Sequence, residues 1–447
     1  MQKMITKIVI QIHTSNKKME YNKTMSLQDI EDLPEDIQPN QEGHIEDTKK
    51  MVRGLKSLKL SLESAELGSY LNPISKSLYP ASDVTSYEIV AAPPSYTGMT
   101  YIGYDSGRIN FLGAQRPRMT VIDGMVYNFI SGSTGSISAH DIEFYHRGND
   151  FSVHIQSYAN GDVQIYVDEQ RMLPTTGTEY LPGSPGINFL NVKFATSKVR
   201  KIRVALGKNP FVQVLVPAVD NIFPSEPRMR AVAIGDSYFE GADLPATGSI
   251  HSRTLVGALK EKTGWDIYNY GQGGTGYINN GAAGSSGLGP SGVAAYGHST
   301  RRAAFNALPS DVKIAIICGG ANDGTFTPAA VKAAAIQLYA DIYTDRPNVS
   351  IIVAGVEAGV YDNISADLDL INTAIKEAAL AAPNVIGFID MRGTPKWITG
   401  TGNAGSIQND GNADIFKASD NVHPTMAGNQ YLADRFVSEF RYMKAVI

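Results

Sequence analysis

The stretch MRAVAIGDS, residues 229–237, places a short apolar run directly before a glycine, an aspartate and a serine. Four later stretches also contain a short, mostly apolar run. They are WDIYNYG (265–271), VKIAIICGG (312–320), NVSIIVAGV (348–356) and NVIGFID (384–390). Strands that are apolar on both faces are typical of parallel sheets with helices on both sides. Residues 229–237 therefore predict the first strand of an α/β domain.

Helical patterns separate these apolar runs, as the crossovers of a parallel sheet require. We expect three helices from about residue 251, near 299–307 and over 328–343. Apolar stripes at helical spacing predict two more, one through Leu368, Ile371 and Ile375 and one through Leu432, Phe436, Phe440 and Met443. Residues 228–447 are thus predicted to form a parallel sheet with helices on both faces.

Residues 81–227 instead alternate apolar and polar residues, which indicates half-buried antiparallel strands. Alternating residues on both sides of Asn160-Gly161 predict a hairpin of 151–155 with 163–167, and Asp123-Gly124 predicts a second hairpin. Many short strands with turn signals predict an all-β sandwich or jelly roll.

Residues 1–80 form a third, polar segment. The stretch 27–43 is an acidic linker with two prolines, and apolar residues between Met51 and Ala65 predict one short amphipathic helix. This helix either packs on its own domain or joins copies of the chain as a short coil. The first residues lack the apolar segment and small-residue cleavage site of a secretory signal, so none is expected.

The composition excludes several classes of function. The chain has 447 residues, a net charge of −5 and one cysteine, Cys318. Nucleic acid is not an expected partner of such an acidic chain, and no apolar run reaches the roughly 18 residues of a membrane span. Cys318 has no cysteine partner, and we expect it to be buried at the end of its strand.

Polar residues follow the predicted strands at their carboxyl ends, where open parallel sheets carry their sites. Ser237 follows the first strand and Asn322 the third, while Asp420 and His423 precede the last helix. A serine needs an adjacent base to act as a nucleophile, and a carboxylate can orient that base. Taken singly, Ser237 could cap a helix and Asn322 could lie in a turn. Taken together, the residues favour a serine hydrolase.

The sequence resembles the SGNH (GDSL-type) hydrolases in four motifs that occur in the family's order: Gly-Asp-Ser at 235–237, Asn269 with Gly274, Gly-Ala-Asn-Asp at 320–323 and Asp-x-x-His-Pro at 420–424. The resemblance implies a flavodoxin-like fold over 228–447, with no metal and no organic cofactor. It implies Ser237 as nucleophile, His423 as base and Asp420 as its orienting acid. It also implies an oxyanion hole of Ser237, Gly274 and Asn322. Tyr238 stands where the motif has leucine, which leaves the acyl specificity open.

A β-sandwich ahead of such a domain resembles carbohydrate-active esterases, which implies cofactor-free removal of O-acetyl groups from a polysaccharide. Tyr238, Tyr277 and Trp397 lie near the motifs, and we expect them to bind sugar. The alternative enzyme is a lipase or thioesterase for longer acyl chains. The expected substrate is an acetylated polysaccharide or a small acyl ester, and no membrane partner is expected.

A different class of hypothesis is a virion component. The three-part organisation resembles bacteriophage tail proteins that deacetylate host glycans, with residues 1–80 serving assembly or oligomerisation. Such a protein would lie in the virion, and otherwise a cytoplasmic location is expected. A glycan-binding module without activity is a third hypothesis, which the complete set of motifs disfavours.

Two other patterns could indicate ligands. Gly271-x-Gly273-x-x-Gly276 matches the dinucleotide fingerprint, but no acidic residue occurs between Asp266 and Asp311 to bind the ribose. His140, His146 and His154 cluster in the predicted β domain. Ordinary strand histidines are the commoner explanation of such a cluster, and we expect no metal there.

Overall fold

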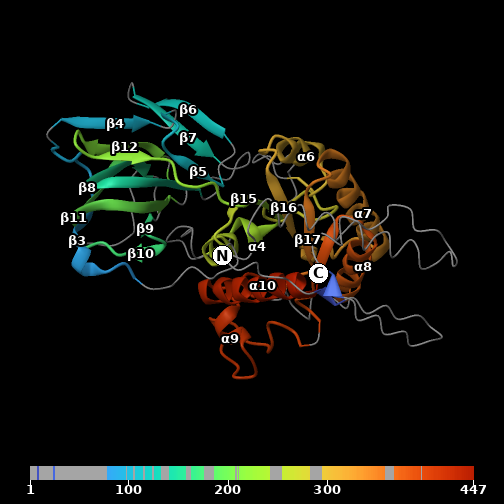
Figure 1. Ribbon diagram of the computed structural model, residues 1–447. Helices are drawn as coiled ribbons and strands as arrows, with labels where there is room; N and C mark the ends of the chain where they lie inside the picture. The colour runs from blue at the N-terminus through green and yellow to red at the C-terminus, as the bar shows by residue number, and fades with distance from the viewer. Residues whose placement is uncertain are drawn as a thin grey trace.

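The computed structural model describes most of the chain after residue 77 and two short pieces before it. The described residues are 8–9, 24–25, 78–96, 98–103, 106–113, 116–122, 125–131, 140–157, 163–175, 186–206, 209, 211–241, 254–281, 294–357, 367–393 and 395–446. The helix predicted between Met51 and Ala65 lies outside them. An antiparallel β region, residues 78–223, lies beside an α/β domain, residues 230–446 (Figure 1). No helix in these ranges is both long and apolar enough to cross a membrane.

The β region is built on one nine-stranded sheet in which every pairing is antiparallel. Its strands are β3 (Val84–Val90), β4 (Met99–Gly103), β5 (Asn110–Leu112), β8 (Asp141–Ser157), β9 (Gln164–Val167), β10 (Gln170–Met172), β11 (Gly186–Ala205), β12 (Phe211–Pro217) and β13 (Asn221–Phe223). A short helix, η1 (Ala81–Asp83), precedes β3, and β1 (Ile8–Val9) pairs separately with β2 (Thr24–Met25).

Two long strands, β8 and β11, organise this sheet. They pair with each other in two stretches, and the register shifts between Lys193 and Lys198. On one side of the shift they pair with β3 and β12, and on the other side with β9 and β13. The predicted antiparallel β domain is therefore confirmed. Its further division into the two sheets of a sandwich stays a prediction, because both long strands run through both halves.

The two predicted hairpins have different outcomes. β6 (Arg116–Ile122) and β7 (Met125–Ser131) pair antiparallel, as predicted around residues 123–124, which themselves lie outside the described ranges. The hairpin of 151–155 with 163–167 is wrong, because β11 lies between β8 and β9 in the sheet. β9 instead turns into β10 through Asp168-Glu169, whose φ values of 51° and 64° are those of a tight two-residue hairpin turn.

The α/β domain contains the predicted five-stranded parallel sheet. Its strands are β14 (Arg230–Gly235), β15 (Asp266–Gly271), β16 (Val312–Cys318), β17 (Ser350–Ala354) and β18 (Val385–Ile389). Their order is β15-β14-β16-β17-β18, which is the flavodoxin-like order. The side chains of β14 from Ala231 to Ile234 are buried, as expected for a sheet covered on both faces.

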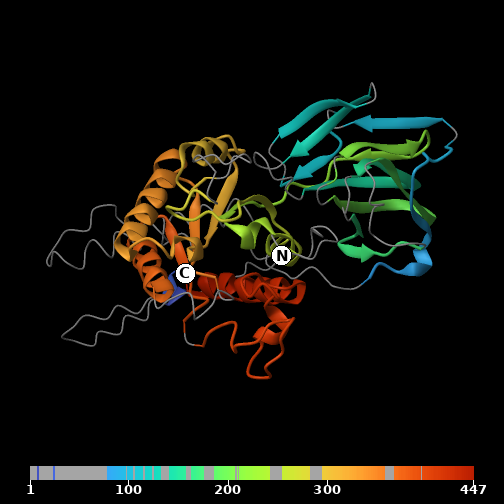
Figure 2. The same ribbon diagram turned by 180° about the vertical axis from the view of Figure 1, so that it is seen from behind.

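The helices of this domain are α4 (Ser237–Glu240), α5 (Leu255–Thr263), α6 (Ser299–Asn306), η4 (Ala321–Asp323), α7 (Pro328–Asp345), α8 (Asp367–Ala381), α9 (Ala413–Phe416) and α10 (Met426–Val446). α5 packs against α10 and α7 packs against α8, and the two views place these pairs on opposite faces of the sheet (Figures 1 and 2). The helices predicted near 299–307 and over 328–343 are confirmed as α6 and α7.

The β region docks at the amino ends of β14 and β15. The Gly113 amide donates to Asp266, the first residue of β15, at 2.5 Å. Just before β14, Arg228 donates to Glu143 of β8 at 2.9 Å and to the Gly264 carbonyl at 3.0 Å. These contacts lie at the strand ends opposite to those that carry the candidate site.

Candidate active site

Ser237 lies in a tight turn between β14 and α4. Asp236 caps the helix, and its Oδ1 accepts from the Tyr238 amide at 3.0 Å. A Cβ atom at Gly235 would lie 2.8 Å from the Phe239 ring and 2.9 Å from the Cys318 carbonyl oxygen, so only glycine fits. The turn holds the serine at the carboxyl end of β14, the first strand of the domain along the chain, as predicted.

The structure brings together the three residues predicted as a catalytic triad. His423 Nε2 lies 2.8 Å from Ser237 Oγ, and His423 Nδ1 lies 2.5 Å from Asp420 Oδ2. These residues come from segments 186 positions apart. Both contacts have hydrogen-bond length, so the imidazole can accept the serine proton while the carboxylate fixes the other ring nitrogen.

The loop that carries His423 is fixed from two sides. Asp420 Oδ1 accepts from the amides of Val422 and His423 at 2.9 and 3.0 Å. The Tyr238 hydroxyl donates to the Val422 carbonyl at 2.6 Å. Tyr238 is 3% exposed, so its ring is not an open sugar-binding face. The tyrosine in place of the motif's leucine instead ties the helix after the nucleophile to the histidine loop.

Two of the residues predicted for the oxyanion hole, Asn322 and Gly274, lie in segments next to the serine turn: Asn322 contacts Asp236, and a Cβ atom at Gly273 would lie 3.8 Å from Ser237 Cβ. Asn322 Nδ2 donates to the Thr275 carbonyl at 2.9 Å and to Asp236 Oδ2 at 3.2 Å. Gly274 has φ +72°, a conformation that favours glycine, in the turn after β15. Ser237 is the first residue of α4, where amides lack partners within the helix. The donor role of the three residues stays a prediction.

The other two aromatic residues predicted to bind substrate are packed inside the domain. Tyr277 is 4% exposed, and its hydroxyl lies 2.9 Å from the Tyr339 hydroxyl. Trp397 is 4% exposed and packs edge-on against Phe436. Both rings are part of the packed core, so neither offers an exposed face to a sugar. Cys318 is buried, as predicted.

The glycine pattern at 271–276 does not form a phosphate-binding turn. The amides of Tyr277, Ile278 and Asn279 donate to the Asp323 carboxylate at 2.7 to 3.0 Å. These backbone amides thus already donate to a carboxylate of the protein, which joins the turn to the segment that carries Asn322. This arrangement argues against the dinucleotide hypothesis.

The histidines of the β region lie in separate environments. His146 Nε2 is 3.5 Å from Asp220, while His154 stacks on Phe189 and lies 3.2 Å from Gln213. His140 is buried as well. Within the described ranges, no group of three or more His, Cys, Asp or Glu side chains is arranged to hold a metal.

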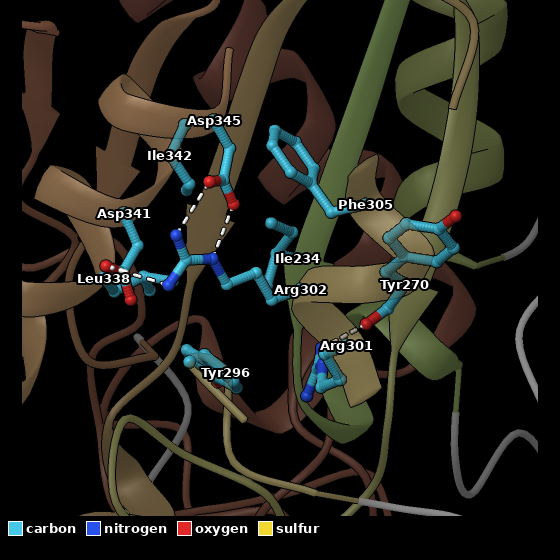
Figure 3. Close-up of a pocket in the computed structure, with 11 residues that line it drawn as sticks. Ile234, Tyr270, Tyr296, Arg301, Arg302, Phe305, Leu338, Asp341, Ile342 and Asp345 are labelled. Carbon is cyan, nitrogen blue, oxygen red and sulfur yellow. Dashed lines mark hydrogen bonds and ion pairs between the residues drawn. The ribbon is translucent and has the colours of Figure 1, made fainter. Parts of the chain in front are cut away.

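Arg301 of α6 is a buried cation beneath the site that the sequence did not single out. It donates to the Gly235 carbonyl at 3.1 Å, to Thr275 Oγ1 at 3.1 Å and to the Tyr270 carbonyl, and so joins the ends of β14 and β15. Burial lowers the pKa of its guanidinium to about 10. Its neighbour Arg302 points instead toward Asp345 on α7 (Figure 3). Both arginines lie in one helical pattern, and that pattern does not indicate which of them is buried.

The pocket in Figure 3 is separate from the triad. Its lining comes from β14, β15, α6, α7 and the segment before α6: Ile234, Tyr270, Tyr296, Gly297, Arg301, Arg302, Phe305, Leu338, Asp341, Ile342 and Asp345. Ser237 and His423 are not among these residues.

Residues 233–431 match the GDSL-like lipase/acylhydrolase family. No curated protein matches the sequence. Among solved structures, a family two carbohydrate esterase from Cellvibrio japonicus has a TM-score of 0.52 at 11% identity, with 78% of this chain and 99% of that chain covered. A similar esterase from Clostridium thermocellum, in complex with cellohexaose, has a TM-score of 0.51 at 16% identity, with 78% and 100% covered. The salicylyl-acyltransferase SsfX3 from a tetracycline biosynthetic pathway has a TM-score of 0.56 at 14% identity, with 77% and 98% covered.

Proposed function

Because residues 233–431 form a GDSL-like lipase/acylhydrolase domain and the chain is a carboxylic ester hydrolase, we propose that it removes O-acetyl groups from a polysaccharide. The observation that carries this proposal is the alignment of Ser237, His423 and Asp420 through contacts of 2.8 and 2.5 Å. This alignment supplies an activated nucleophile without a metal or an organic cofactor.

The proposed reaction proceeds in two steps. Ser237 Oγ attacks the acetyl carbon while its proton passes to His423 Nε2, and the sugar oxygen leaves with that proton. Water then attacks the acetyl-enzyme with His423 as base, which releases acetate and restores the serine. In both steps the negative oxygen receives hydrogen bonds from the amides of Ser237 and Gly274. It also receives one from Asn322 Nδ2, which shares with it the N–H that points to Asp236 at 3.2 Å.

The surroundings of Ser237 support a small acyl group. The His423 imidazole lies 2.8 Å from Ser237 Oγ, and a Cβ atom at Gly273 would lie 3.8 Å from Ser237 Cβ. Glu240 holds this glycine turn by accepting from the Gly273 amide at 2.7 Å. A long acyl chain would need an extended apolar lining. The cellohexaose in one structural neighbour and the name of another, an acetyl xylan esterase from Butyrivibrio proteoclasticus, support a polysaccharide.

Acetate release from acetylated xylan by the full chain tests the proposal. The wild type should release acetate, and among p-nitrophenyl esters it should prefer acetate to octanoate. Ser237→Ala should abolish both activities without loss of folding, because it removes only the hydroxyl. A preference for octanoate would instead support the lipase or thioesterase alternative. Acetyl transfer to an added sugar alcohol in place of hydrolysis would support an acyltransferase.

The virion hypothesis concerns residues 1–80, nearly all of which lie outside the described ranges. Light scattering on the full chain tests it, because an assembly role for this segment predicts an oligomer. A monomer at all concentrations would remove the support for that role.

A further inference from the structure

Two buried carboxyl groups lie directly behind the serine and asparagine of the site. Asp236 follows β14 and is 2% exposed, while Glu357 lies just beyond the end of β17 and is 0% exposed. The two carboxyl groups are hydrogen-bonded to each other. The proton transfers of the triad do not use Glu357, so its burial at this position needs another explanation.

Glu357 is connected to Asn322 by two routes. Its Oε2 accepts at 3.3 Å from the amide of Ala321, the first residue of the short helix that carries Asn322. Its other route runs through Asp236, whose Oδ2 accepts from Asn322 Nδ2 at 3.2 Å. The carboxyl pair therefore holds the backbone at Ala321, next to Asn322, and the side chain of Asn322 itself.

The hydrogen bond between two carboxyl groups requires that one of them carries a proton. Burial raises the pKa of Asp236, but its hydrogen bonds from the Tyr238 amide and from Asn322 and the charge of Arg301 favour its ionised form. Glu357 Oε1 has no hydrogen-bond donor among the described residues. Burial and the negative charge of Asp236 hold the pKa of Glu357 well above its ordinary value. The proton therefore resides on Glu357.

We propose that Glu357 is a positioning residue of the oxyanion hole, which acts as a neutral hydrogen-bond donor to Asp236 and thereby holds the Asn322 amide beside Ser237. The inference rests on the proposed ester hydrolysis at Ser237, and it does not depend on which polysaccharide is the substrate. It assigns a role to a residue outside the four motifs.

Paired substitutions of Glu357, assayed on p-nitrophenyl acetate, test the proposal. Glu357→Gln keeps a neutral donor and an acceptor, so its kcat should stay within about threefold of the wild type. Glu357→Ala removes both and should lower kcat about tenfold or more with KM nearly unchanged, because an oxyanion exists only in the transition state. A Gln variant as impaired as the Ala variant would overturn the neutral-donor role, and so would a loss that appears in KM alone.

The pH profile gives a readout that a merely structural role would not change. In the wild type, kcat should fall at alkaline pH as Glu357 loses its proton, whereas Glu357→Gln should lack this loss. The other titratable or charged groups around the pair are Arg301, His423, Tyr296, Cys318 and Asp323, and all remain in both proteins. An alkaline loss that is the same in both proteins would contradict the proposal, even if the alanine variant does not fold.

Two controls separate the possible failures. Adding Glu357→Ala to Asn322→Ala should change kcat little, because Glu357 acts through Asn322, and additive losses would overturn the proposal.

Glu143 of the β region is equally buried and bonded to Ser225 and Arg228. Glu143→Gln should lower thermal stability without lowering kcat. If Ser237→Ala keeps full activity the proposed function fails, whereas an inactive Ser237→Ala beside a fully active Glu357→Ala overturns only this inference.

Discussion

The β region and the α/β domain both place histidines near hydrogen-bonding side chains, but the histidines differ in burial and in their ability to exchange a proton. His146 and His154 are 0% and 4% exposed, and burial lowers the pKa of each to about 4. His423 is partly exposed, with a carboxylate at 2.5 Å on one ring nitrogen and a serine at 2.8 Å on the other. Burial keeps the imidazoles of His146 and His154 neutral, although Asp220 lies 3.5 Å from His146. The partly exposed His423, between a carboxylate and a serine, can take and return a proton.

The strongest test of this contrast is a matched pair of substitutions. His423→Ala should reduce kcat/KM roughly 10⁴-fold or more, because the serine loses its base. His154→Ala should leave kcat near the wild-type value and lower the melting temperature, because it removes only a buried ring that stacks on Phe189. Steady-state kinetics and thermal melts of both variants provide the measurement. Equal losses of activity would show that the two histidines do not differ as described.

Asn322→Ala should produce the next largest effect. The variant loses a donor to the developing oxyanion, so kcat should fall roughly 10²- to 10³-fold with little change in KM. Asn384→Ala is a suitable control, since Asn384 is a buried asparagine that donates to the Tyr339 carbonyl, away from the triad. A rise in KM with an unchanged kcat would make Asn322 a substrate-binding residue instead.

Ser237 and Asn322 could be predicted because each follows an apolar strand, whereas Asp420 and His423 could be predicted from a family motif before the last helix. The structure brings His423 to Ser237 and Asp420, and Asn322 to Asp236 beside the serine. Glu357 was not predicted as a site residue, although its position just after the apolar strand at 348–356 is the same signal that indicated Ser237 and Asn322. Arg301 could not be predicted, since its burial depends on carbonyl groups from three separate segments. The wrong hairpin has a similar cause, because local alternation does not show that β11 would enter between β8 and β9.

Acid should destabilise the β region through its buried histidines. His154 has a pKa of about 4 when folded, against about 6.5 when unfolded, so its contribution is complete above pH 6.5 and is lost as the pH falls toward 4. The loss is on the order of 3 kcal/mol for this side chain. Denaturant unfolding at several pH values measures it, and His154→Phe should show a weaker dependence on pH.

The two tryptophans allow this loss to be assigned to a region. Trp265 and Trp397 both lie in the α/β domain, so tryptophan fluorescence reports that domain alone. Circular dichroism, which also detects the β strands, should therefore respond to acid before fluorescence does. Coincident transitions would show that the two regions unfold together.

Tyr238→Phe should have the smallest effect. It removes the hydroxyl that donates to the Val422 carbonyl at 2.6 Å and keeps the buried ring. Loss of one hydrogen bond of about 1 kcal/mol predicts a roughly fivefold fall in kcat, as the His423 loop becomes less well held. Tyr339→Phe removes a buried hydroxyl that bonds only within the core near Tyr277 and serves as the control. A fall in kcat of the same size in both variants would remove the special role of Tyr238.

Covalent labelling tests the identity of the nucleophile most directly. A serine-directed phosphonate, followed by peptide mass spectrometry, should modify Ser237 once per chain and should abolish acetate release in proportion to the labelled fraction. His423→Ala should label much more slowly, because the serine then lacks the base that lies 2.8 Å away. Labelling of another residue, or acetate release that persists after Ser237 is fully modified, would contradict a mechanism based on Ser237.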